Sequence, residues 1–125
     1  MQRLATLALL GLSAAACVSA DGPFLVRGRV LTPDARPLRQ CSLAVNTSRK
    51  PPTESYRWRP FSERFQEFTL TQYKREFIHV ACPGWRPFVG LVQYDKKRGW
   101  TYDSVQYFAA GDTIDMGTIV LAPLP

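Results

Sequence analysis

After its N-terminal segment, the chain is a series of short stretches in which apolar and polar residues alternate, separated by turns rich in Pro, Gly and Asp. In 24–31, for example, valines fall on one side of an extended chain and arginines on the other. The same pattern predicts strands at 24–31, 41–47, 65–71, 76–82, 88–94, 100–108 and 114–121. About seven short strands in about 100 residues predict an all-β fold, a single antiparallel β-sandwich.

The N-terminal segment has the plan of an export signal. Arg3 precedes the apolar run 4–12, and small residues then lead to Cys17. The run is shorter than the ~20 apolar residues that span a bilayer. The stretch 12–17 resembles a bacterial lipobox, which implies a signal peptide over 1–16 and acylation of Cys17. A tether over 17–23 and a sandwich domain over 24–123 would follow.

A second cleavage site is also possible. Val18-Ser19-Ala20 fits an ordinary small-x-small site, which would release a soluble periplasmic protein starting at Asp21. If Cys17 is acylated instead, Val18 stands where an acidic residue often retains lipoproteins in the inner membrane. We therefore expect an outer-membrane lipoprotein that faces the periplasm.

Three cysteines in an exported chain leave one without a partner. Acylation of Cys17 would leave Cys41 and Cys82, each on the apolar side of its predicted strand. The sequence therefore predicts a disulfide between two inward-facing positions, which an oxidising periplasm permits. The alternative is a pair of buried free thiols.

The chain carries a net charge of +6. Such a surface attracts anionic lipid headgroups, phosphorylated glycans or an acidic envelope protein, although a soluble surface with some excess charge is the simpler interpretation. Export argues against nucleic acid as a partner.

The pattern Val26-Arg27-Gly28-Arg29-Val30, followed by Pro37-Leu38, resembles the start of the carboxypeptidase regulatory-like domain, a transthyretin-like sandwich. The strand 78–82 with Gly84-Trp85, and the last strand at 114–121, are similar to later parts of that family. The resemblance implies an accessory or docking module without a cofactor. The chain departs from it at 48–64, where a loop rich in Pro, Arg and aromatic residues replaces the family's usual turn.

Little in the sequence suggests catalysis. His79 is the only histidine, and the alternation places it opposite Ile78 and Val80, toward solvent or the second face of its sheet. No metal site, catalytic set or phosphate-binding loop is expected, so the chain is predicted not to be an enzyme, with a small hydrolase as the less favoured alternative.

The 48–64 loop carries the candidate binding residues. Aromatic and arginine side chains are enriched at binding hot spots, and this loop has Tyr56, Arg57, Trp58, Arg59 and Phe61. The alternative is that Trp58 and Phe61 fold back to cap an edge of the sandwich. A second candidate, 96–98 with Trp100, is more typical of a charged hairpin tip.

These features favour a non-catalytic binding or structural module of the cell envelope, attached to the membrane through Cys17. Its partner would be an unidentified envelope protein or an anionic glycan or lipid. The alternative is an inhibitor or immunity-type lipoprotein that blocks a partner enzyme with the 48–64 loop.

The lipobox interpretation makes a direct prediction. Cys17→Ser should release soluble protein into the periplasm or stall processing, because the acylated thiol is lost. Fractionation and N-terminal sequencing measure this. A wild-type protein that is already soluble and begins at Asp21 would contradict it.

Overall fold

In a computed structural model, described for residues 24–69, 74–97, 99–102, 106–107 and 113–125, nine strands form two sheets. The strands are β1 (Phe24–Leu31), β2 (Cys41–Asn46), β3 (Arg59–Phe61), β4 (Arg64–Thr69), β5 (Arg75–Ala81), β6 (Phe88–Asp95), β7 (Gly99–Tyr102), β8 (Gln106–Tyr107) and β9 (Thr113–Val120). A short 3-10 turn, η1 (Ser55–Arg57), precedes β3. No helix in this described part is long and apolar enough to cross a membrane.

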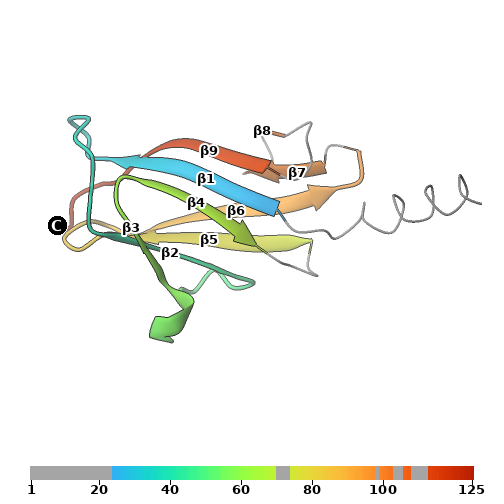
Figure 1. The fold of residues 1–125 in the computed structure, drawn as a ribbon, viewed down its shortest axis with the longest axis horizontal. Coiled ribbons are helices and arrows are strands. Elements are labelled where there is room, and N and C mark those ends of the chain that lie inside the picture. Colours follow the sequence, from blue (N-terminus) through green and yellow to red (C-terminus); the bar gives the residue numbers. More distant parts are fainter. Residues whose placement is uncertain (1–23, 70–73, 98, 103–105, 108–112) are drawn as a thin grey trace, which may run out of the picture.

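The two sheets lie face to face, as expected for a sandwich (Figure 1). Within the described residues, the smaller sheet has the order β4-β1-β9 and the larger has the order β3-β2-β5-β6-β7-β8. Strands β1 and β9 pair in parallel, whereas the other strand pairs are antiparallel. The all-β sandwich prediction is confirmed, and the parallel pair is a difference from the antiparallel arrangement expected.

The core lies between the sheets and follows the predicted alternation. Its buried side chains include Val26 and Val30 of β1, Leu43 of β2, and Ile78 and Val80 of β5. Trp100 of β7 is 2% exposed and packs against the Phe24 ring, with 4.4 Å between ring centroids. Trp100 therefore belongs to the core and not to an exposed site at the 95–99 turn.

An additional strand occupies part of the predicted 48–64 loop. Strand β3 pairs antiparallel with β2, placing Pro60 opposite Ser42. Proline disfavours a central strand but is tolerated at a sheet edge, and β3 is the edge strand of its sheet. The prolines at 51, 52 and 60 predict one continuous loop over 48–64, but β3 occupies 59–61 and β4 begins at Arg64.

The chain changes sheets between β3 and β4, at Glu63. Its backbone has φ +65°, and its N–H donates to Leu38 O at 2.8 Å while its carbonyl accepts from Val30 N–H at 2.9 Å. Glu63 thus links the segment that leads into β2 to β1 of the smaller sheet.

The predicted disulfide is present. Cys41 and Cys82 are bonded and 4% and 5% exposed, with Cα atoms 4.2 Å apart. Cys41 begins β2 and Cys82 follows β5 directly, so the bond joins neighbouring strands of one sheet at positions that face the core. Cys17 and the predicted tether lie outside the described residues.

The disulfide should contribute measurably to stability. It closes a loop with a sequence separation of 41 residues, so replacing both cysteines by alanine should lower the free energy of unfolding by about 2–4 kcal/mol. Urea denaturation measures this, and reductant should destabilise the wild type by a similar amount without affecting the double variant. A double variant as stable as the oxidised wild type would contradict the prediction.

Candidate functional site

The loop between β2 and β3 covers the outer face of β5 in the larger sheet. Five consecutive residues of β5 are buried, from Glu76 to Val80, although a strand with one solvent face alternates between buried and exposed residues. His79 is 1% exposed. It lies on the second face of its sheet, one of the two positions expected from the sequence, but it does not face solvent.

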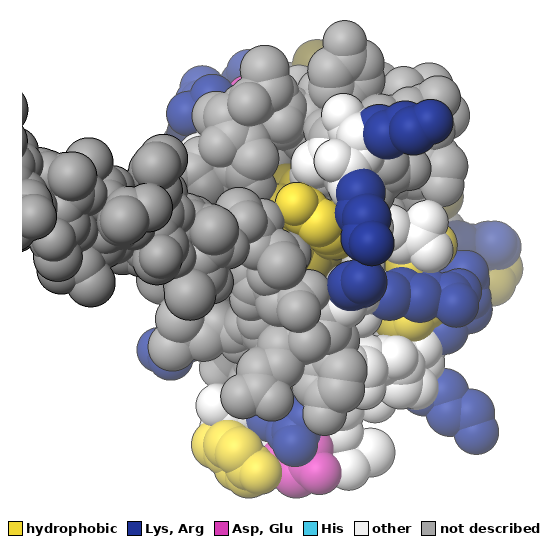
Figure 2. Space-filling view, turned by 90° about the vertical axis from the view of Figure 1, so that its right-hand side faces the viewer, with side chains coloured by type: hydrophobic (Ala, Val, Ile, Leu, Met, Phe, Trp, Pro, Cys, Tyr) yellow, Lys and Arg dark blue, Asp and Glu magenta, His cyan; other side chains and the backbone are white. Residues whose placement is uncertain are grey.

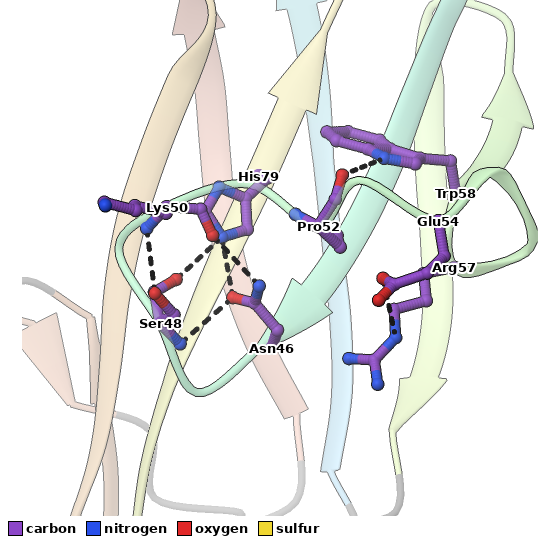
Figure 3. A network of polar contacts seen from close by, with 8 residues as sticks. All are labelled: Asn46, Ser48, Lys50, Pro52, Glu54, Arg57, Trp58 and His79. Carbon is purple, nitrogen blue, oxygen red and sulfur yellow. Dashed lines mark hydrogen bonds and ion pairs between the residues drawn. The ribbon is translucent and has the colours of Figure 1, made fainter.

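His79 binds the first part of the loop. Its Nε2 lies 2.8 Å from Asn46 Oδ1 and 3.0 Å from the Ser48 carbonyl oxygen (Figure 3). The Asn46 oxygen also accepts the Ser48 N–H, while its Nδ2 donates to Lys50 O at 3.1 Å. Since both partners of Nε2 are acceptors, Nε2 carries the proton and donates it to them.

The other ring nitrogen of His79 is unprotonated in this arrangement. Nδ1 is buried and has no hydrogen-bond partner among the described residues. Burial lowers the pKa of His79 below its usual value, and the hydrogen bond to the Ser48 carbonyl opposes this shift in part. The site therefore favours the neutral imidazole, because a proton on Nδ1 would place a charge in a position without a partner.

Trp58 closes the second part of the loop. Its indole Nε1–H donates to the Pro52 carbonyl at 2.9 Å, and its ring meets the His79 ring edge-on with centroids 6.4 Å apart (Figure 3). Trp58 is half-buried. It caps a face of the sheet, so replacing it would affect the stability of the loop as well as any binding.

Phe77 is covered by two arginines. The Arg49 guanidinium from the loop lies 5.1 Å from the centre of the Phe77 ring, and that of Arg75 lies 5.5 Å from it. Phe77 is 5% exposed. These cation–π contacts cover Phe77 on the outer face and hold Arg49 and Arg75 near the start of β5.

The η1 turn projects from this cover (Figure 1). Tyr56 is 78% exposed. Arg57 Nε lies 3.3 Å from the Glu54 carboxylate, and a hydrogen bond with the Tyr56 side chain, together with the Glu54 charge, raises the pKa of Arg57. Tyr56 and Arg57 thus share one exposed turn whose ends are joined by an ion pair.

The remaining candidates have different environments. Arg59 is bound to Glu67 of β4 at 2.7 Å, with its side chain 75% exposed. Phe61 packs edge-on against Phe65 with 5.2 Å between ring centroids, next to the core. The five predicted binding residues therefore separate into an exposed pair at 56–57, a covering tryptophan, a paired arginine and a core-edge phenylalanine.

The sequence did not identify Asn46, Pro52 and His79 as the residues that hold this loop. The available signal was the run 77–82, which is apolar at every position except His79, because Phe77 and His79 share the face opposite Ile78 and a face open to solvent would be polar. Their cover, however, comes from residues about 20 to 30 positions earlier in the chain, and only the fold brings these together.

A second surface feature lies on the outer face of the smaller sheet. A hollow of about 500 Å³ is lined there by Arg27, Arg29 and Arg64 with neighbouring residues. Arg27 pairs with Asp115 at 3.2 Å and Arg29 with Glu63 at 3.5 Å. These carboxylates neutralise most of its positive charge, so this hollow is weaker than the loop as a candidate site.

The described residues contain no group of three His, Cys, Asp or Glu side chains placed to hold a metal ion. Searches of protein-family models, curated proteins and solved structures find no match to this chain.

The buried histidine predicts a pH-dependent stability. The unfolded chain has an ordinary histidine pKa near 6.5, and the folded pKa is lower. As the pH falls below about 6.5, the unfolded state therefore takes up the proton first, and the free energy of unfolding decreases. Above that pH, the contribution of His79 is fully present.

Urea unfolding at a series of pH values between about 5 and 8 measures this effect. His79→Asn is the control, because the chain has one histidine and the variant lacks this titration. Curves with the same slope for the wild type and the variant would contradict a lowered pKa.

Proposed function

We propose that this chain is a lipoprotein of the bacterial cell envelope, held to the membrane through Cys17, and that it acts as a non-catalytic binding module. The observation that carries the binding role is Tyr56, which is 78% exposed on a turn held in place by the cover over β5. Outer membrane facing the periplasm is the proposed location, with a transthyretin-like sandwich as the scaffold.

The fixed position of the turn supports binding. An ordered loop loses less conformational entropy on association than a loose one, so more of the contact energy appears as affinity. Asn46, Trp58 and the Glu54–Arg57 ion pair hold the chain on either side of Tyr56. Tyrosine and arginine together provide both apolar area and charged hydrogen bonds to a partner.

The burial and hydrogen bonding of His79 support the proposal of a non-catalytic role for this chain. A general base needs an accessible nitrogen within reach of the substrate. The one histidine of the chain is 1% exposed, and its Nε2 proton is already bound to Asn46 and Ser48. Its hydrogen bonds hold the loop after β2 in place.

The inhibitor or immunity-type function remains the second candidate. It is favoured by the projection of η1 beyond the sheets, where a protruding turn could enter the active site of a partner enzyme (Figure 1). Both functions use the same exposed pair, Tyr56 and Arg57, and differ in the nature of the partner.

Photo-crosslinking in intact cells tests the proposal. A photoreactive amino acid at Tyr56 should give a discrete adduct, whereas the same group at Val120, which is 57% exposed on β9, should not. Tyr56→Ala should weaken capture of the identified partner at least about tenfold. It should change the free energy of unfolding by less than about 0.5 kcal/mol, because the side chain is exposed.

Identical adducts from Tyr56 and Val120, or a Tyr56→Ala variant that retains full affinity, would contradict the binding role. If the captured partner is an enzyme that the wild-type chain inhibits and the variant does not, the second candidate is supported.

A further inference from the structure

Three of the chain's four lysines lie at one end of the sandwich, and Lys50 lies on the adjoining outer face, where the loop after β2 turns back toward His79 (Figure 3). Lys50 follows the end of β2, Lys74 precedes β5, and Lys96 and Lys97 form the turn after β6. Strands β2 and β6 run antiparallel to β5, so the end of the first two and the start of the third meet at the same end of the sheet. All four lysine side chains are exposed.

Two arginines extend this cluster. Arg49 and Arg75 are held near the start of β5 by their common contact with the Phe77 ring. We call Arg49, Lys74, Arg75, Lys96 and Lys97, with the adjoining Lys50, the basic end. Figure 2 looks onto this end and shows Lys and Arg side chains spread over its described part.

In the described part of the chain, few exposed carboxylates accompany the basic end. Glu76, at the start of β5, is a described carboxylate of this end, but its side chain is only 5% exposed. Among the described residues, Lys50, Lys74, Arg75 and Lys96 have no carboxylate within 4 Å, whereas Arg27, Arg29, Arg36, Arg57 and Arg59 elsewhere each have one. The side chains of Asp95, next to Lys96 in the sequence, and of Asp112, the residue before β9, lie outside the described residues. The described surface is therefore an anion-attracting one.

The first described residue is at the same end. The Phe24 ring packs on Trp100, which also meets Tyr94, and the Tyr94 N–H donates to Lys74 O at 2.8 Å. Seven residue steps from Cys17 to Phe24 span at most about 25 Å when fully extended. A lipid on Cys17 would therefore hold the basic end close to the bilayer surface.

We propose that the basic end rests on the anionic phospholipid headgroups of the membrane that carries the Cys17 anchor. This inference builds on the proposed function, since it supplies a second membrane signal beside the acyl chains. Each Lys or Arg near an anionic surface favours binding about fivefold, and salt weakens the effect.

The contact also sets the orientation of the domain. With the basic end on the membrane, the η1 turn lies on the flank below β2 and β3, where a partner in the surrounding compartment can reach it (Figure 1). The turns at 32–40 and 83–87 would point away from the bilayer, because they lie at the opposite ends of the same strands.

The full protein, purified from membranes and reconstituted in vesicles, allows a direct test. Vesicles contain phosphatidylcholine alone or with phosphatidylglycerol, and an amine-acetylating reagent labels the lysines. Lys50 and Lys97 should be acetylated about fivefold more slowly on the anionic vesicles. High salt should remove the difference.

Matched variants locate the contact. Lys74→Gln with Lys96→Gln should abolish most of the protection of Lys50 and Lys97. Arg39→Gln with Arg86→Gln, which removes the same charge from exposed positions at the opposite end, should leave it unchanged. Equal acetylation on both vesicle types, or equal loss of protection in both variants, would overturn the proposal.

Flotation of the same samples separates this inference from the anchor itself. If the protein floats with phosphatidylcholine vesicles but its lysines are not protected on anionic vesicles, the proposed contact of the basic end is refuted and the proposed Cys17 anchor is not. If the lysines are protected on anionic vesicles but the protein does not float with phosphatidylcholine vesicles, the proposed Cys17 anchor is refuted and the contact of the basic end with anionic headgroups is supported.

Discussion

The structure depends on the burial of β5 from both sides. A strand with apolar or uncharged side chains on both faces requires a cover on each, because exposure of either face would cost stability. The β4-β1-β9 sheet covers Ile78 and Val80, and the loop after β2 covers Phe77 and His79. The second cover is a segment whose regular structure before β3 is limited to the short η1 turn.

Alternation of apolar and polar residues predicted most of the strands, because it follows directly from the geometry of an extended chain. The single strand predicted at 100–108 was wrong, since β7 and β8 in this range are separate strands that pair antiparallel with each other. The disulfide was also predictable, since Cys41 and Cys82 share the apolar phase of their strands. Two features could not be predicted from the sequence. The first is the edge strand β3, because Pro60 disfavours a strand and β3 forms only by pairing with β2. The second is the loop over His79, because its contacts join segments that are distant in the sequence. Local patterns contain no information on either.

The sequence predicts a candidate binding segment at 48–64, and the structure places its five candidate residues in different environments. Composition alone marked 48–64, but it could not separate Tyr56 and Arg57, which face solvent, from Trp58 and Phe61, which support the fold. The same residue types serve both purposes, so burial decides between them. Under the two proposals, the basic end contacts the membrane and the η1 turn on the flank contacts a partner. The covered strand β5 is the rigid element between them.

The central claim is that the β2–β3 loop is a fixed layer and not a loose linker. Hydrogen exchange followed by NMR on the Trp58 indole N–H and the Ser48 and Lys50 amides tests it most directly, since each donates a hydrogen bond that closes the loop. The account predicts slow exchange at these sites and faster exchange in His79→Asn. Exchange in the wild type as fast as in an exposed linker would contradict it.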